Sequence, residues 1–161
     1  MELLNANSYQ KGAWVLHMLR NEVGDEGFHK IIRSYYEKFA GKNADTDDFR
    51  KTAEKISGKD LKQFFNQWLY EPGQPGLQIL WNYDKEKKEL RLELQQKQSN
   101  AFHFPLDLQI KFPSGESKTE TLIVNSKIKT FTLPVKDKPV SIVLDPGTKL
   151  LFDAILTEKK N

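Results

Sequence analysis

SYQKGAWVLHMLR, residues 8–20, predicts a helix around which the first half of the chain is organised. Asn7 or Ser8 is placed to cap it, because their side-chain oxygens accept hydrogen bonds from the free N–H groups of a first turn. Gly24 is the predicted stop, since glycine enters the left-handed conformation at little cost. The stretch therefore predicts one helix from about residue 8 to residue 23.

This helix carries apolar side chains on more than one side. One face is formed by residues three and four positions apart: Tyr9, Gly12, Ala13, Leu16 and Val23. Trp14, Val15 and Met18 point elsewhere, and a helix that is apolar all round is usually buried. A glycine inside a helix costs about 1 kcal/mol relative to alanine. Gly12 therefore predicts that another segment packs close to the backbone, one turn from the Tyr9 hydroxyl.

Three further helices are predicted before residue 72. The first covers about residues 25–40 and ends at Gly41. The next begins with Asp45 or Thr46 as its cap and stops at Gly58. The last follows Lys59-Asp60 and turns these apolar residues inward: Leu61, Phe64, Phe65, Trp68 and Leu69.

The sequence PGQPG at residues 72–76 ends the helical pattern. Beyond it, apolar residues recur at every second position, which is typical of strands with one buried face. These alternating runs lie around residues 77–83, 90–94, 106–112, 119–124, 128–133 and 140–144. Six or seven short strands at this spacing predict an antiparallel β-sandwich.

The predicted fold class is therefore α+β, with a helical unit at residues 1–71, a linker at 72–76 and a β-sandwich domain at 77–157.

Composition excludes several classes of function. The net charge of the 161 residues is only +3, and the helical half carries equal numbers of basic and acidic residues, so no nucleic-acid footprint is expected. No stretch approaches the roughly 20 apolar residues of a membrane span. The chain has no cysteine, which excludes disulfides and thiolate metal sites.

The motif Tyr9-x-Lys11-Gly12-Ala13, followed by an apolar helix ending in Met18-Leu19-Arg20, resembles a segment of the thermolysin-like zinc metallopeptidases of the aminopeptidase N type, which are gluzincins. Weaker matches follow in the order of that family. They are Thr46-Asp47-Asp48-Phe49, Ser57-Gly58-Lys59-Asp60-Leu61, Phe64-Phe65, Gln67-Trp68-Leu69 and Gly73-x-Pro75. The order and spacing of these fragments make the resemblance more specific than any one of them.

The resemblance implies a role for Tyr9. In that family the matching hydroxyl donates a hydrogen bond to the oxyanion formed when zinc-bound water attacks the scissile carbonyl. A phenol is protonated at neutral pH, and a donor aimed at developing negative charge stabilises a transition state by a few kcal/mol. The resemblance also implies a small β-sandwich after the catalytic domain.

The zinc-binding His-Glu-x-x-His is missing, because His17, His29 and His103 have no histidine partner four residues on. The family's Gly-x-Met-Glu-Asn loop, which binds the substrate amine, is also missing. The resemblance places both before the tyrosine. We therefore expect the C-terminal piece of an aminopeptidase, inactive alone, whose zinc and peptide-binding groups come from an upstream catalytic domain of the same polypeptide. No metal is expected to bind this piece.

Ordinary structural roles compete with these assignments. From spacing alone, Tyr9 is an aromatic residue near a helix start, the lone histidines are surface or hydrogen-bonded groups, and Phe64, Phe65 and Trp68 are packing residues. Two alternative functions stay open: a non-catalytic interaction module, and an inactive relative of the peptidases.

Overall fold

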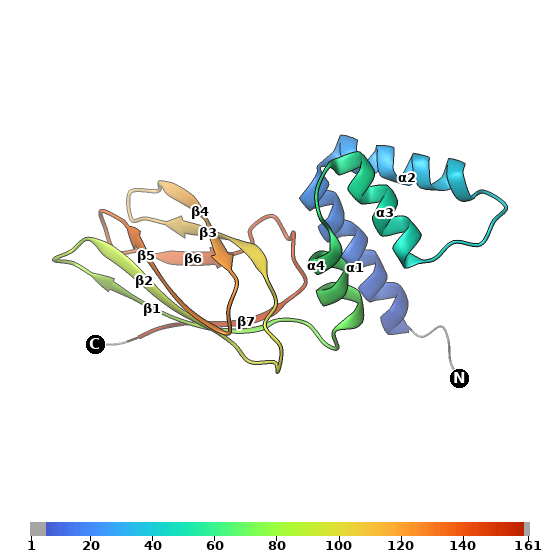
Figure 1. Cartoon of the computed structure of the whole chain (residues 1–161). Helices are drawn as coiled ribbons and strands as arrows, with labels where there is room; N and C mark the ends of the chain where they lie inside the picture. Colours follow the sequence, from blue (N-terminus) through green and yellow to red (C-terminus); the bar gives the residue numbers. More distant parts are fainter. Residues whose placement is uncertain (1–5, 160–161) are drawn as a thin grey trace. The chain divides into compact units, whose positions relative to one another are not determined.

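The computed structural model describes residues 6–159, with side chains from Tyr9 onward. The chain forms two compact units, one ending at Pro72 and the other beginning at Gly73 (Figure 1). The first unit is helical and the second consists of two sheets, which confirms the predicted α+β class. Each unit is described by itself.

From residue 6 to Pro72, the helical unit contains four α-helices and one π-helix. Their bounds are α1 Ala6–Val23, α2 Asp25–Phe39, α3 Thr46–Ser57, α4 Lys62–Phe65 and η1 Asn66–Tyr70. The predicted caps of the first helix are wrong, because α1 begins before Asn7 and Ser8 and both lie inside it. A helix extends at little cost once its first turn exists, and Ala6 has the highest helix propensity of any residue. Gly24 (φ 78°) ends α1 as expected.

The helix α3 has both of its predicted end signals. The Asp45 carboxylate accepts a hydrogen bond from the backbone N–H of Asp48 at 2.9 Å, and the Asp48 carboxylate accepts one from the Asp45 N–H at 3.3 Å. This reciprocal capping box satisfies two N–H groups at the helix start. Gly58 (φ 71°) closes the other end in the left-handed conformation.

The predicted fourth helix differs from expectation in its last turn. It starts at Lys62, whose N–H donates to the Asp60 carboxylate at 2.9 Å, and it continues as the π-helix η1. The N–H of Glu71 donates to the Asn66 carbonyl at 3.2 Å, a bond that spans five residues instead of four. Turns of this kind are rare and occur frequently at functional sites.

An apolar core cluster holds the four α-helices together. Its buried members come from α1, α2, α3, α4 and the residue just before α4: Leu19, Ile31, Ala53, Leu61 and Phe65. Partly buried aromatic residues surround them, including Phe49, whose ring packs edge-on against Phe65 with the centroids 6.1 Å apart. Burial of this kind contributes about 1.5–3 kcal/mol for each large apolar side chain.

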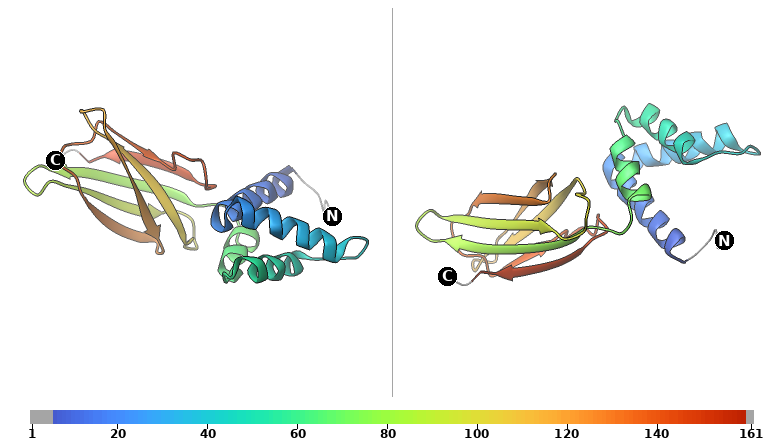
Figure 2. Two further views of the ribbon diagram at one scale, coloured as in Figure 1. Left: turned by 90° about the horizontal axis from the view of Figure 1, so that it is seen from above. Right: turned by 60° about the horizontal axis from the view of Figure 1, so that its bottom comes forward.

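The described part of the second unit, residues 73–159, contains seven strands. Their bounds are β1 Gly76–Asp84, β2 Glu89–Gln96, β3 Phe104–Lys111, β4 Ser117–Val124, β5 Ile128–Pro134, β6 Ser141–Leu144 and β7 Asp153–Glu158. One sheet has the order β5-β2-β1-β7 and the other β4-β3-β6. Figure 2 shows the two sheets as separate layers of this unit.

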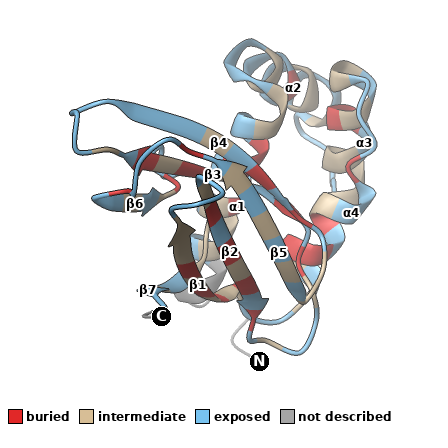
Figure 3. Ribbon diagram, turned by 90° about the vertical axis from the view of Figure 1, so that its left-hand side faces the viewer, coloured by how far each residue is buried: buried red, intermediate tan, exposed pale blue. Residues whose placement is uncertain are grey.

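Alternation along the strands builds the core between the layers. Every second residue is buried along β2, β3 and the first six residues of β1, as Figure 3 shows for the central strands. The register sets Ile79 opposite Leu94 and Leu92 opposite Trp81, so buried side chains of paired strands share one face. All neighbouring strands are antiparallel except β1 and β7, which run parallel from the Gly76–Asp153 pair to the Trp81–Glu158 pair.

Candidate functional site

The N-terminal half of α1 is the candidate site, and its two sides differ sharply in burial. Val15, Met18 and Leu19 are buried. On the opposite side, Tyr9 is 66% exposed and Leu16 is 40% exposed. Within the described residues α1 is therefore covered on one side only, whereas its composition suggested burial on several.

Gly12 lies one turn from Tyr9, on a part of α1 with free space around it. A Cβ atom added at Gly12 would meet no heavy atom within 4 Å, outside its chain neighbours and the backbone of its own helix. The close packing that the sequence predicted at this glycine is therefore not supplied by residues 6–159.

Lys11 lies on the other side of the helix from Tyr9, because two residues along an α-helix turn the side chain by about 200°. Its ammonium donates a hydrogen bond to the Glu71 carbonyl at 3.0 Å. This contact joins α1 to the residue that ends η1, 60 positions along the chain. Nothing in the local sequence pattern of Lys11 indicates this bond.

The C-terminal half of α1 carries His17, which is exposed. Its ring packs edge-on against Trp14 with the centroids 5.6 Å apart, and its Nε2 lies 3.2 Å from the Asn21 amide nitrogen. At the turn to α2, Arg20 donates to the Asp25 carboxylate at 2.7 Å, and this hydrogen bond and the adjacent positive charge lower the pKa of Asp25. These contacts account for the polar residues of this half.

Zinc is the metal that the resemblance implies, and the described part of the chain does not fit it. Within residues 6–159, no three His, Asp or Glu side chains are grouped so as to hold a metal ion. His17 lies on α1, His29 on α2, and His103 belongs to the second unit.

Residues 6–159 include no helix long and apolar enough to cross a membrane.

A polar cluster surrounds Asp107 in the second unit, where the backbone N–H of Asp145 donates to the Asp107 backbone carbonyl at 2.7 Å. The Lys149 ammonium already lies 2.7 Å from the Asp107 carboxylate, whose other oxygen accepts from the Thr121 hydroxyl. The hydrogen bond from Lys149, followed by that from Thr121, lowers the pKa of Asp107. This cluster contains its own cation and stabilises the loop that follows β6.

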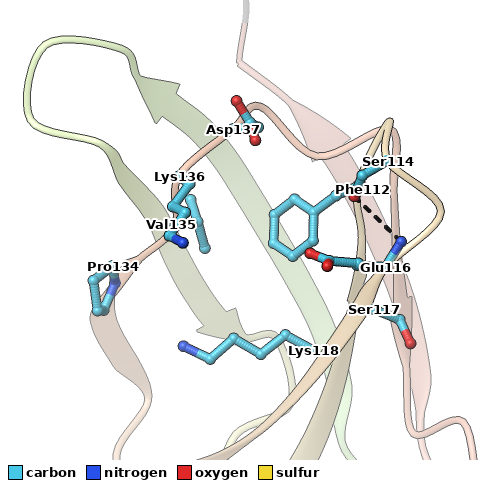
Figure 4. A pocket seen from close by; sticks show the side chains of 9 residues that line it. All are labelled: Phe112, Ser114, Glu116, Ser117, Lys118, Pro134, Val135, Lys136 and Asp137. Atoms are coloured by element: carbon cyan, nitrogen blue, oxygen red, sulfur yellow. Dashed lines mark hydrogen bonds between the residues drawn. The ribbon is translucent and has the colours of Figure 1, made fainter.

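A pocket of about 270 Å³ lies between the turn after β3 and the segment after β5 (Figure 4). Phe112 and Val135 supply apolar lining. Charged residues of both signs also line it, namely Glu116, Lys118, Lys136 and Asp137. This mixture of charges favours no single class of ligand.

Comparison with known proteins gives a family match over α1 and most of the helical unit. Residues 1–68 match the Peptidase family M1 domain. The chain is 36% identical over 97 residues to "Aminopeptidase M1-A" of Oryza sativa subsp. japonica, an alignment that covers 60% of this chain and 10% of that protein. It is 29% identical over 151 residues to "Glutamyl aminopeptidase" of Bitis rhinoceros, covering 92% of this chain and 16% of that protein.

The fold has a solved counterpart. A crystal structure of Legionella pneumophila aminopeptidase A in complex with aspartic acid aligns with a TM-score of 0.80 and 22% sequence identity. The alignment covers 95% of this chain and 18% of that one. The chain thus spans less than a fifth of the length of each of these relatives.

Proposed function

Because the chain belongs to peptidase family M1, we propose that it is part of a zinc-dependent aminopeptidase, which removes N-terminal residues from peptides. The observation that carries this proposal is the match of residues 1–68 to the family domain. These residues contain α1 and nearly all of the helical unit. The relatives are named for aminopeptidase activity, which we transfer to the parent protein and not to the isolated chain.

Tyr9 is the residue to which we assign a catalytic role, as the hydrogen-bond donor to the oxyanion. Its position supports this role in one respect: the side chain is 66% exposed, on the side of α1 away from the helical core. A phenol buried among core residues would have no access to a substrate. A donor pre-positioned at developing negative charge typically changes turnover by 10²–10³-fold.

The zinc ligands, the general base and the groups that hold the substrate amine would then come from an upstream catalytic domain of the same polypeptide. The described residues contain no group of metal ligands, so no step of the chemistry is assigned to a metal held by this chain. The contribution of this chain is Tyr9 and the helical unit that carries it. We expect the 161-residue chain alone to cut no peptide.

The direct test uses the full-length parent, purified with zinc and assayed for release of p-nitroaniline from aminoacyl-p-nitroanilides. We expect hydrolysis that o-phenanthroline abolishes and added zinc restores. The 161-residue chain, assayed at the same concentration, serves as the control and should show no hydrolysis. A zinc-loaded parent that cleaves no aminoacyl substrate or N-terminal peptide bond would instead support an inactive relative or an interaction module.

Gly12 gives a second test, because the proposed upstream domain would supply the missing neighbour. Gly12→Ala should stabilise the isolated chain by about 0.5–1 kcal/mol, since alanine is the better helix former and its Cβ meets open space. In the parent, the same change should lower turnover by obstructing the close approach. Urea unfolding of the chain and kcat of the parent measure the two effects.

Gly27→Ala is the matched control for Gly12→Ala. Gly27 is also helical, and its added Cβ would lie 3.6 Å from the Val23 Cβ, an ordinary contact. We expect it to leave the turnover of the parent unchanged. Full activity of the Gly12→Ala parent would argue that no backbone packs against this turn of α1.

A further inference from the structure

We propose that Lys11 is a positioning residue, which fixes the first turns of α1 and thereby the direction of Tyr9. This inference rests on the proposed function of Tyr9. The observation behind it is the hydrogen bond from the Lys11 ammonium to the Glu71 carbonyl at 3.0 Å, which is partly buried.

The core does not reach the part of α1 that carries Tyr9. From Tyr9 onward, where side chains are described, the first buried residue is Val15, and no side chain of residues 9–14 is fully buried. Leu19 belongs to the core cluster of the helical unit, nearly three turns beyond Tyr9. Lys11 therefore anchors, through its hydrogen bond, the end of the helix that the apolar core does not contact.

The acceptor is suited to a cation. Glu71 directly follows the last residue of η1 as its C-terminal cap, and its own N–H bonds to the Asn66 carbonyl. Carbonyls at the end of a helix lack partners within it and carry partial negative charge, which attracts a lysine ammonium. The five-residue turn of η1 sets where this carbonyl lies, and hence where Lys11 and its helix are held.

Tyr9 and Lys11 point to opposite sides of the same helical turns. A shift of Lys11 along or around the helix axis therefore moves Tyr9 by a comparable amount. A displacement of about 1 Å in a positioned catalytic group can cost 10²-fold in rate. Loss of the Lys11 bond should accordingly lower the turnover that depends on Tyr9, without removing any group that touches the substrate.

The experiment is a double-mutant cycle in the full-length parent. Lys11→Met, which keeps an unbranched side chain one heavy atom shorter and removes the ammonium, should lower kcat by about 10- to 100-fold and leave KM within about twofold. Lys11→Arg, which retains a cationic donor, should recover most of the loss. In the Tyr9→Phe background, Lys11→Met should cause little further loss, because a residue that acts through Tyr9 has nothing left to position.

Lys59→Met is the matched control. Lys59 also donates from its ammonium to a backbone carbonyl, that of Glu22 at 2.6 Å, but at the far end of α1. Its replacement should leave kcat unchanged.

Four results would overturn the inference: wild-type kcat in Lys11→Met, an equal loss in the Tyr9→Phe background, an equal loss from Lys59→Met, or loss of the helical circular-dichroism signal in Lys11→Met. If Tyr9→Phe itself retains full turnover, the proposed role of Tyr9 fails, and the role of Lys11 with it. If Tyr9→Phe is impaired and Lys11→Met is not, only the inference about Lys11 fails.

Discussion

Tyr9→Phe is expected to lower the turnover of the full-length parent by about 10² to 10³-fold, because it removes the proposed donor to the oxyanion and little else. The substitution deletes a single oxygen from a side chain that is 66% exposed, so it should not disturb the helical core. The measurement is kcat on an aminoacyl-p-nitroanilide, together with the zinc content of the purified protein, which should stay the same.

Tyr36→Phe is a suitable control, since Tyr36 is an exposed tyrosine on α2, at 72%, with no proposed role. Its turnover should equal that of the unmodified parent. Unchanged turnover in Tyr9→Phe would remove Tyr9 from the mechanism, whatever the parent hydrolyses. A fall in zinc content equal to the fall in turnover would also contradict the assigned role, because the loss would then follow the metal and not the donor.

Leu19→Ala should destabilise the helical unit by about 2–5 kcal/mol, the cost of removing a fully buried leucine and leaving a cavity. Leu19 packs in one cluster with Ile31 of α2, Ala53 of α3 and Phe65 of α4, so all four α-helices depend on it. Urea unfolding of the 161-residue chain, followed by circular dichroism at 222 nm, measures this loss in the helical transition. The β-sandwich transition should not move.

Leu16→Ala provides the control within the same helix. Leu16 is 40% exposed, so its truncation should cost less than about 1 kcal/mol in the isolated chain. Both variants replace a leucine with alanine, and the two positions lie three residues apart in the same helix. Equal destabilisation by both would show that α1 packs through a different face from the one described.

These two leucines also show where prediction from the sequence succeeds and where it stops. A helix over residues 8–23 follows from its periodicity and from Gly24, and local chemistry at Asp45 and Gly58 also fixed the ends of α3. The side of α1 that meets the core does not follow, because apolar residues occupy several sides. Leu19, its most deeply buried residue, belongs to neither of the two groups of apolar residues named from the sequence.

Contacts between distant residues account for the other differences. The π-helical turn of η1 and the bond from Lys11 to Glu71 depend on how the end of the helical unit meets α1, which no local pattern encodes. The apolar residues of β7, whose sequence is DAILTE, are adjacent and do not alternate, so the pattern gave no signal for this strand. Its parallel pairing with β1 was likewise not expected in a sandwich predicted to be antiparallel. For the candidate site, the sequence motif indicates Tyr9 and Gly12. It does not indicate the hydrogen bond from Lys11 to the Glu71 carbonyl, which lies on the other side of the same turns.

The parallel pairing of β1 with β7 has a mechanical consequence for the second unit. These are the first and last strands of that unit, and six residue pairs join them. Tension applied between Gly76 and Glu158 therefore pulls the two strands past each other, so that all the hydrogen bonds of the ladder bear the load together. A sandwich whose terminal strands are parallel neighbours is therefore loaded in shear when it is stretched. Its ladder hydrogen bonds must break together and not one after another.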